Sequence, residues 1–594
     1  MRLIKILLLC TFFITCRSQI KAFEPVDLSG PWQFKFDQQN QGIKEKWYQD
    51  NKTDPWQKIK VPGSFNNTFR NSLWYQGKAW YKKSFIIPPE WPAGRLYLRF
   101  LGVVIRCKVW LNGKFLGEHL FPFTGFEFDI SDVIQDGANL LTVQVDNKKL
   151  RSAIPDTKWN GWWDFGGITR QVYLEWRPDT FTKNVSLATA QLDKDKWELK
   201  LNVKTMSTAS VTGSLDYAVE DITGKRIWHN KSSASFSKGI TAADLSAQMK
   251  GIKAWSPKSP NLYYLKIKTR VPNEIPDVKR IRFGFREIKV QGTQIFLNGK
   301  PLLIKGISRH ELYPGTGSTI SAIRTKMDLQ DIKDLGCNMI RTAHYTQHPL
   351  VYDLCDELGL LVWTEIPAWK TRTETLADDH VWKNYGAPQL QEMVEQNRNH
   401  PSIIVWSVGN EFSSDKAGTA KYVKRACNYV RTLDSTRLVT FASDKRERDI
   451  CFDFVDVIAV NEYFGWYYGN IYDVGPKLDQ LHQLWPGKPI MVSEFGSGSI
   501  LGWAEPSPPD SGKDYSEDYQ IKFLTTHLAQ IYSGKRKFVA GGLIWNYADF
   551  ADPHRIGSGH PALANYVNCK GLVTRNRQKK RAFAIVKNFY KNLK

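Results

Sequence analysis

Two glutamates, Glu411 and Glu494, lie at the ends of short apolar runs that are typical of buried parallel strands. Two carboxyl groups held about 5–5.5 Å apart can hydrolyse a glycosidic bond with retention, one giving a proton to the leaving oxygen and the other attacking the anomeric carbon. A gap of about 6.5–9.5 Å would give inversion, and the sequence leaves that alternative open. A single glutamate after a core strand is more often a plain surface residue, so the hypothesis depends on the pair.

The elements that must position this pair are predicted from a strand–helix rhythm that begins after residue 288. Helical patterns separate several apolar runs, and eight such units in about 300 residues is the expected size of a (β/α)8 barrel. Active sites of this fold lie at the carboxyl ends of the strands, and Glu411 and Glu494 rise from the fourth and seventh. The eight predicted strands are Leu302–Ile307, Met339–Tyr345, Leu361–Ile366, Ile403–Asn410, Leu438–Ser443, Val455–Tyr463, Ile490–Gly496 and Gly541–Phe550.

Other polar residues fall at the same predicted strand ends. His310 follows the first strand, and Arg341 and His344 belong to the second. A strand-end histidine is more often structural than catalytic, so these three residues are assigned supporting roles near the substrate. Glu365 and Glu462 end the third and sixth strands and are candidates for carboxylates at the rim or behind it.

Two all-β segments precede the predicted barrel. From residue 23 to 178, alternating strands such as Arg95–Phe100 and a hairpin signal at Asn112-Gly113 predict a jelly-roll β-sandwich. Short alternating strands over residues 179–288 predict an immunoglobulin-like β-sandwich with a spacer role. The predicted fold is therefore multidomain, with two all-β sandwiches followed by an α/β barrel over residues 289–594.

The amino-acid composition limits the kinds of molecule that the protein is expected to bind. The chain carries a net charge of +23 and 22 tryptophans. An excess of aromatic side chains suits a protein that stacks on sugar rings. No long Lys/Arg block and no nucleic-acid-binding motif is visible, so nucleic acid is not an expected partner. The charge is interpreted as a dispersed basic surface, with an anionic substrate as the lesser alternative.

The first 22 residues are predicted to be a signal peptide. Positive charge at the start precedes an apolar run that is too short to span a bilayer. Cleavage after Ala22 and export are favoured over lipid anchoring at Cys16, because the residues before Cys16 form a poor lipobox. No later segment is apolar enough to be transmembrane. The six remaining cysteines show no paired or metal-binding spacing and are predicted to be buried thiols.

Four motifs occur in order along the predicted barrel. They are Asn410-Glu411, Asn461–Tyr467, Ser493–Gly496 and Trp545–Phe550. Together with the two preceding sandwiches, the chain resembles glycoside hydrolase family 2 over nearly its whole mature length. Each motif alone is weak, and their order and spacing give the resemblance its force.

The resemblance implies roles for individual residues. Glu411 corresponds to the acid/base and Glu494 to the nucleophile of the family, and Tyr463 is implied to orient Glu494. Because the acid must be protonated near neutrality, the pKa of Glu411 is expected to lie above its ordinary value, raised by the charge of Glu494. The resemblance further implies contacts with the sugar from Asn410, Tyr467 and Trp545.

The identity of the sugar is indicated by Asn568 and Lys570, which match the Asn-x-Lys motif of the β-glucuronidases in this family. An ammonium and an amide would hold the carboxylate of a uronic acid, whereas the neutral sugar of a galactosidase would gain nothing from the lysine. Two departures from the family pattern put a preference for glucuronate over galacturonate in doubt. Ala564 replaces an arginine of some members. The sugar-binding aspartate of the jelly roll has only Asn160 and Asp164 as candidates.

The resulting hypothesis is a retaining, exo-acting β-glucuronidase. It would act on a small-molecule or oligosaccharide uronide and need no cofactor and no metal. A β-galacturonidase or β-galactosidase of the same family is the first alternative, and a non-catalytic carbohydrate-binding protein is the remote one. The resemblance to the family, and no feature of the sequence itself, also allows a homo-oligomer.

Overall fold

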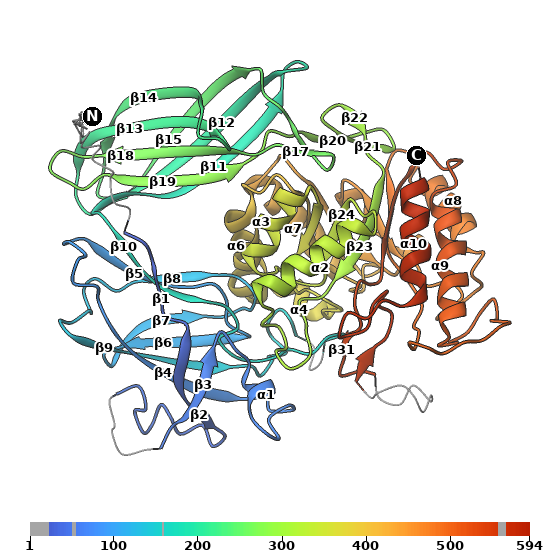
Figure 1. Cartoon of the computed structure of the whole chain (residues 1–594), viewed down its shortest axis with the longest axis horizontal. Helices are drawn as coiled ribbons and strands as arrows, with labels where there is room; N and C mark the ends of the chain where they lie inside the picture. The colour runs from blue at the N-terminus through green and yellow to red at the C-terminus, as the bar shows by residue number, and fades with distance from the viewer. Residues whose placement is uncertain (1–22, 50–54, 157–159, 556–565, 594) are drawn as a thin grey trace, which may run out of the picture.

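The structure is a computed structural model that describes residues 23–49, 55–156, 160–555 and 566–593. Figure 1 shows two β-sandwiches stacked on one side and a barrel with its helices on the other. The predicted signal peptide, with Cys16 and Ala22, lies outside the described residues, as does Ala564. None of the helices within the described ranges combines the length and the apolar character needed to cross a membrane.

The first sandwich begins the described chain. Its sheets have the strand orders β1-β10-β5-β8 and β3-β2-β4-β9-β6-β7. Alternating residues of both sheets, with Trp32, Phe34 and Tyr81 among them, form its core. Its elements are β1 Val26–Asp27, β2 Gly30–Asp37, β3 Gln57–Val61, α1 Phe65–Thr68, β4 Lys78–Ile86, β5 Arg95–Phe100, β6 Arg106–Leu111, β7 Lys114–His119, β8 Phe126–Asp129, β9 Ala138–Asp146 and β10 Val172–Arg177.

The second sandwich pairs a three-stranded sheet, β11-β12-β15, with a four-stranded sheet, β14-β13-β18-β19. Seven strands in two antiparallel sheets are the immunoglobulin-like arrangement that the sequence predicts. The elements are β11 Thr180–Gln191, β12 Lys196–Ser207, β13 Val211–Asp221, β14 Arg226–Phe236, β15 Gly239–Lys250, β16 Trp255–Ser256, β17 Ser259–Pro260, β18 Tyr263–Arg270 and β19 Asp277–Phe283.

Eight parallel strands, β23 to β30, close into a barrel, which confirms the predicted fold class. A small antiparallel sheet of β20 Ile288–Gln291, β21 Gln294–Leu297 and β22 Lys300–Pro301 packs against the barrel interior. The barrel strands are β23 Ile304–Arg309, β24 Met339–Thr342, β25 Leu361–Glu365, β26 Ile403–Asn410, β27 Leu438–Ser443, β28 Ile458–Asn461, β29 Ile490–Phe495 and β30 Val539–Ile544.

Helices surround the barrel, and α10 packs beside α9 at the carboxyl end of the chain (Figure 1). The helix predicted around residues 327–336 is α2, and Gly336 follows it with a φ of +96°. Such a glycine after a helix adopts the left-handed conformation at little cost. The helices are α2 Ala322–Asp334, α3 Pro349–Leu358, α4 Thr373–Ala377, α5 Asp379–Val381, the π-helical η1 Trp382–Gly386, α6 Ala387–Asn397, α7 Ala417–Leu433, η2 Arg446–Arg448, η3 Phe452–Phe454, α8 Val474–Leu484, α9 Glu517–Ile531 and α10 Arg581–Asn592.

The eighth strand is shorter than predicted. It ends at Ile544, and residues 545–549 no longer form a regular strand, although Trp545 N–H still donates to Phe495 at 2.8 Å and Tyr547 N–H to Ser308 at 2.9 Å. Their backbone bonds with a later segment: Leu572 N–H donates to Asn546 at 3.0 Å, and Asp549 N–H donates to Val573 at 2.9 Å. The ribbon of β31 Phe550–Ala551 and β32 Val567–Asn568 follows from this pairing and brings Asn568 back over the barrel.

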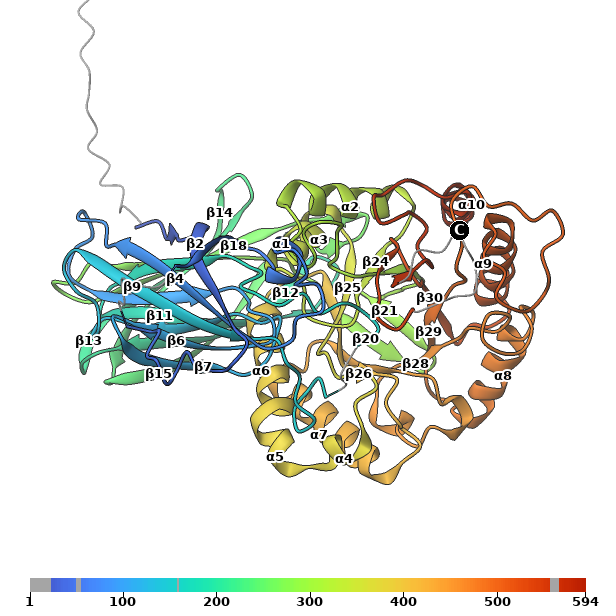
Figure 2. The same cartoon turned by 90° about the horizontal axis from the view of Figure 1, so that it is seen from below.

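The jelly roll reaches the barrel through a loop between β9 and β10. There Arg170 pairs with Glu311 at 3.1 Å, and Asp156 pairs with Arg372 at 2.9 Å. Figure 2 shows the sandwiches against one side of the barrel. The six cysteines after residue 22 are free and buried, as predicted.

Candidate active site

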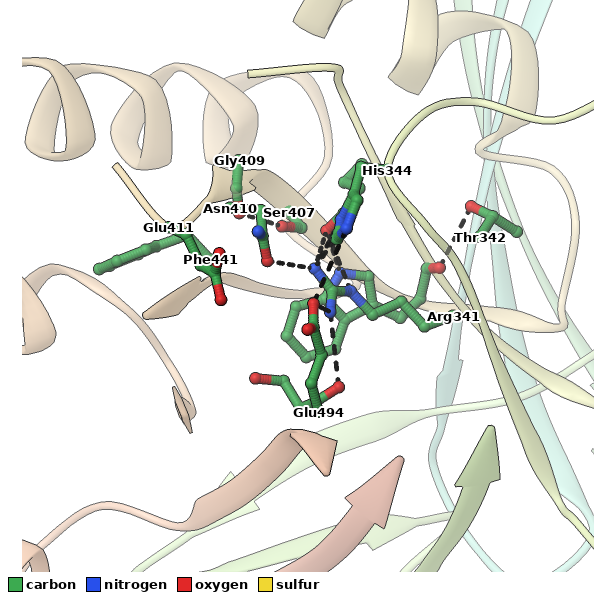
Figure 3. Close-up of polar contacts among 12 residues, drawn as sticks. Arg341, Thr342, His344, Ser407, Gly409, Asn410, Glu411, Phe441 and Glu494 are labelled. Atoms are coloured by element: carbon green, nitrogen blue, oxygen red, sulfur yellow. Dashed lines mark hydrogen bonds and ion pairs between the residues drawn. The ribbon is translucent and has the colours of Figure 1, made fainter. Parts of the chain in front are cut away.

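A cavity of about 1130 Å³ opens at the carboxyl ends of the barrel strands and holds both predicted catalytic carboxylates. Glu411 follows β26 directly, and Glu494 belongs to β29. Figure 3 shows both glutamates with Arg341 lying between Asn410 and Glu494. Residues of the jelly-roll loop and of five barrel loops complete the wall, so the cavity is built jointly by two domains.

A bulge at the end of β26 aims Asn410 and Glu411 toward the same neighbour. Ser407 pairs with Thr440 and Asn410 with Ala442, so β26 has one extra residue against β27. Glu411 has a φ of +50°, the left-handed conformation, which turns its side chain back. As a result Asn461 Nδ2 donates to Glu411 Oε1 at 2.8 Å and lies 3.3 Å from Asn410 Oδ1.

The bulge depends on Gly409, which predicts a sharp effect of substitution. A Cβ at Gly409 would lie 2.5 Å from the Phe412 ring and 2.6 Å from the Ala368 carbonyl oxygen, at a φ of +149°. We expect Gly409→Ala to lower kcat by about 10²-fold, because a misplaced catalytic group loses roughly that much. The control is Gly487→Ala, since a Cβ there meets nothing within 4 Å. An unchanged kcat for Gly409→Ala would show that the bulge does not set the position of Glu411.

Glu494 is held by two strong hydrogen bonds. Arg341 Nη1 donates to Glu494 Oε1 at 2.7 Å, and the Tyr463 hydroxyl donates to Oε2 at 2.6 Å. Burial, with the charge of Glu411 adding to it, raises the pKa of Glu494 to about 7, while Arg341 and Tyr463 oppose that rise. Both oxygens are fixed in direction, as a nucleophile that attacks one carbon requires.

Arg341 connects three acceptors beneath the cavity. Besides Glu494, its guanidinium donates to Asn410 Oδ1 at 2.7 Å and to Glu365 at 2.9 Å. His344 lies 2.7 Å from the same Glu365 carboxylate and 3.8 Å from Glu494. His344 lines the cavity, whereas Arg341 is fully buried behind it. The geometry therefore gives Arg341 a positioning contact with the carboxylates in place of the predicted contact with substrate.

The surroundings of Glu411 shift its pKa in the direction opposite to the predicted one. Lys370 Nζ lies 3.3 Å from Glu411 Oε2. Burial would raise the pKa of Glu411, but the charge of Lys370, the hydrogen bond from Asn461 and the nearby His344 outweigh it and lower that pKa. The sequence predicted a raised value because it could not place Lys370, which lies in the loop after β25.

Lys370 should therefore control the acid limb of the pH profile. The productive form needs Glu411 protonated and Glu494 ionised. Because the pKa of Glu411 is lowered and that of Glu494 is raised to about 7, the acid limb of kcat/KM follows Glu411 and the alkaline limb follows Glu494. Lys370→Gln removes the charge that lowers the pKa of Glu411, and we expect the acid limb of kcat/KM to move to higher pH. Lys148→Gln, which changes another lysine of the cavity wall, should leave the acid limb in place. An acid limb that stays still in Lys370→Gln, or moves to lower pH, would contradict this assignment.

The far side of the cavity forms a cage around Lys570. Its Nζ lies 4.1 Å from the Trp466 ring centroid, 4.6 Å from that of Tyr467 and 4.9 Å from that of Tyr463. It donates to the Gly496 carbonyl at 3.3 Å. Burial lowers the pKa of Lys570 well below its ordinary value, and the positive charge of Arg555 adds to this effect. An anion arriving beside Nζ would reverse that unfavourable burial.

Asn568 and Arg555 lie at the same end. Asn568 lines the cavity and accepts from the Lys570 backbone N–H at 3.3 Å. Arg555 Nη2 donates to the Tyr467 hydroxyl at 2.8 Å, and its Nε lies 3.3 Å from Asp552. The Asn-x-Lys motif, Tyr467 and a second cation are thus brought together.

Four predicted substrate contacts, Asn410, Arg341, His310 and Asp164, fall outside the described lining of the cavity. His310 lies behind it, with its ring centroid 5.4 Å from that of Trp545 and 4.1 Å from that of Phe550. Asp164 forms an ion pair with Lys149 and accepts from Asn160 at 3.2 Å. Trp545, by contrast, lines the cavity, with its ring stacked against His344 at 4.9 Å.

Several lining residues were missed from the sequence. Lys370, Arg372 and Asp444 follow the third and fifth strands, and Lys148 and Arg151 come from the jelly roll. Position after a predicted strand was an available signal for the barrel residues. The jelly-roll residues carried none, because no local pattern shows that their loop meets the barrel.

One possible metal-binding group occurs among the described residues, away from the cavity wall. Asp353, Asp356 and His400 lie close enough to share an ion. Arg282 already supplies a positive charge to these carboxylates, with its Nη2 2.7 Å from Asp353 and 3.7 Å from Asp356. A guanidinium that pairs with both carboxylates satisfies the charge that a metal ion would otherwise supply.

The sequence matches three descriptions of one family along its length. "Glycosyl hydrolases family 2, sugar binding domain" matches residues 26–178, "Glycosyl hydrolases family 2" matches residues 183–286, and "Glycosyl hydrolases family 2, TIM barrel domain" matches residues 288–594.

Relatives and solved structures extend this similarity. The β-glucuronidase of Mus musculus is 28% identical, over 95% of this chain and 90% of that protein. The apo structure of β-glucuronidase from Ruminococcus gnavus superposes with a TM-score of 0.86 at 26% identity, covering 96% of this chain and 97% of that one. The GH2 β-galacturonidase from Eisenbergiella tayi bound to galacturonate gives 0.83 at 29% identity, covering 97% and 98%. The similarity spans all three domains.

Proposed function

The chain belongs to glycoside hydrolase family 2, and on that premise we propose that it is a retaining, exo-acting β-glucuronidase that releases terminal β-D-glucuronic acid. The observation that carries the choice of sugar is Lys570. Its ammonium is buried at the cavity wall, and the described part of the chain places no carboxylate within ion-pair distance of it. A substrate carboxylate would supply the missing anion.

The proposed reaction uses the two glutamates in sequence. Glu494 attacks C1, the bond from C1 to the leaving oxygen breaks, and Glu411 gives its proton to that oxygen. A water then transfers a proton to Glu411 and attacks C1, which frees Glu494 and releases the sugar with its original configuration. The hydrogen bonds from Arg341 and Tyr463 to Glu494 support its role as nucleophile.

Asn410 supports the binding of a sugar hydroxyl. Its Oδ1 accepts from Arg341 at 2.7 Å, while its Nδ2 is buried without a hydrogen-bond partner among the described residues. A buried donor normally has a partner, so this one is available to a ligand. The 2-hydroxyl of the sugar is the group expected there, a contact that strengthens in the transition state.

A β-galacturonidase is the second candidate, favoured by the similarity to the enzyme of Eisenbergiella tayi bound to galacturonate. Glucuronate and galacturonate differ only in the configuration at C4, so Lys570 would hold the carboxylate of either one. Ala564, where some relatives carry an arginine, leaves both sugars open. A β-galactosidase is disfavoured because its neutral substrate would leave Lys570 buried without an anion.

A panel of three 4-nitrophenyl β-glycosides tests this proposal: the glucuronide, the galacturonide and the galactoside. The glucuronide should give the highest kcat/KM and the galactoside the lowest. Proton NMR of the first-formed product should show the β-anomer, as retention requires. A preference for the galacturonide selects the second candidate, and turnover of none of the three contradicts the uronide assignment.

We also propose that the protein is exported to the periplasm or the medium, with residues 1–22 as a signal peptide and with lipid anchoring at Cys16 as the lesser alternative. Sequencing the N-terminus of the mature protein tests both, and an intact Met1 would contradict export by cleavage. Light scattering tests for the homo-oligomer that the family resemblance makes possible.

A further inference from the structure

The cavity extends beyond the two catalytic glutamates on the side of Glu411. Its volume of about 1130 Å³ exceeds the usual range for a small-ligand pocket, about 300–1,000 Å³, so there is room for more than one sugar ring. Lys570 marks the side where the uronate carboxylate is proposed to lie. The group bonded to the glycosidic oxygen must pass Glu411, which donates the proton to that oxygen.

Basic residues line this leaving-group side in a continuous path. Lys370 Nζ contacts Glu411, and Arg372 follows two residues later. Arg372 Nη2 donates to the Arg151 backbone oxygen at 2.8 Å, which joins the loop after β25 to the jelly-roll loop. Lys148 lies three residues before Arg151 and also lines the cavity. Two domains thus contribute cations along one wall.

Most cations of the cavity wall already have a carboxylate partner. Arg372 pairs with Asp156 at 2.9 Å, and Lys149 pairs with Asp164. In the described ranges, Lys148, Arg151 and Lys570 are the three lining cations with no carboxylate within 4 Å. Lys570 is assigned to the sugar, which leaves Lys148 and Arg151, both exposed, facing the leaving group.

The acidic residues of this wall do not cancel that charge. Asp156 is neutralised by Arg372, and Asp444 pairs with Lys445 at 2.7 Å. Trp369 adds an aromatic face beside the path, with Lys370 Nζ 5.0 Å from its ring centroid. Aromatic faces and unpaired cations together suit a sugar that carries a negative group.

We propose that the leaving-group side of the cavity is a binding site for an anionic residue, a sugar that carries a carboxylate or a sulfate ester next to the scissile bond. The proposal rests on the function proposed above, because it needs a glycoside seated against Glu411. Lys148 and Arg151 attract the anion, and Lys370 and Arg372 line its path to Glu411. The preferred substrate is then an acidic oligosaccharide with charge on both sides of the bond that breaks.

Matched substrates test this with the full chain. One is the β-glucuronide of 7-hydroxycoumarin-4-acetic acid, and the other is the glucuronide of its N-methyl amide, which differs by one negative charge. A third, with a methanesulfonate at the same carbon, stands for a sulfate ester and separates the two anion types. The variants are the double Lys148→Gln/Arg151→Gln and, as a control on the same domain, Lys114→Gln, an exposed lysine that does not line the cavity.

The double variant should lose roughly 3- to 10-fold in kcat/KM on an anionic substrate and change less than about twofold on the amide, as expected for exposed charges. Added salt should reduce the wild-type preference for the anion, and Lys114→Gln should behave as wild type. The carboxylate and sulfonate arms show which anion is preferred. Equal losses on both substrates, or none, would overturn the inference while leaving the uronide function intact. Failure to hydrolyse any of the glucuronides would overturn the function itself.

Discussion

Glu494→Ala is expected to lower kcat on an aryl β-glucuronide by on the order of 10⁴- to 10⁶-fold, the loss that follows removal of a nucleophile. The carboxylate is the only group held by both Arg341 and Tyr463 at the cavity wall of the described structure. Without it no glycosyl-enzyme forms, and the two donors face an empty space. Thermal unfolding of the variant should show that the fold persists, since Arg341 keeps its contact with Glu365 at 2.9 Å.

Azide separates the two glutamates in a way that activity alone cannot. In Glu494→Ala, azide can occupy the vacated carboxylate space and attack C1 directly, so the product should be the α-glycosyl azide. In Glu411→Ala, azide instead attacks the intermediate held on Glu494 and should give the β-glycosyl azide. Identical anomers from the two variants would contradict the assignment of nucleophile and acid/base.

Lys570→Met is expected to lower kcat/KM on the glucuronide by about 10²- to 10³-fold, because it removes the charged partner of a buried substrate carboxylate. Methionine keeps an unbranched side chain among the rings of Tyr463, Trp466 and Tyr467, so the cage retains its filling. The measurement compares the glucuronide with its uronamide, which has the same shape and no charge. Wild type should favour the acid strongly, and the variant should favour neither.

A variant that keeps its preference for the acid would show that the carboxylate binds elsewhere. Arg555 is the neighbouring cation to examine in that case, because its guanidinium lies at the same end and donates to Tyr467 at 2.8 Å. A variant that loses activity equally on both substrates would point to a packing defect in the cage.

The sequence was most informative where a regular pattern carries the chemistry. The fourth and fifth strands were predicted with the bounds that β26 and β27 have, because both are largely apolar and every residue in them is buried. Glu411 directly follows the first of these strands, so its position at the active-site end of the barrel could be predicted. The eighth strand was predicted too long, since its last residues bond with residues 570–573, a long-range pairing that no local pattern encodes.

Side-chain roles were harder to predict than positions. The pKa of Glu411 was expected to be raised, yet Lys370 lowers it from a loop whose path is set by packing. Arg341 was expected near the substrate, but its planar donor group instead satisfies Glu365, Asn410 and Glu494 together. These are many-body contacts between distant strands, and they depend on geometry that spacing in the sequence does not contain.

The loop between β9 and β10 has a consequence for how such an enzyme can diversify. Both catalytic glutamates belong to the barrel, whereas Lys148 and Arg151 belong to the sandwich. On the leaving-group site proposed above, substitutions at Lys148 and Arg151 would change which aglycones are accepted without altering Glu411 or Glu494. The range of substrates and the catalytic reaction would then depend on different domains of the same chain.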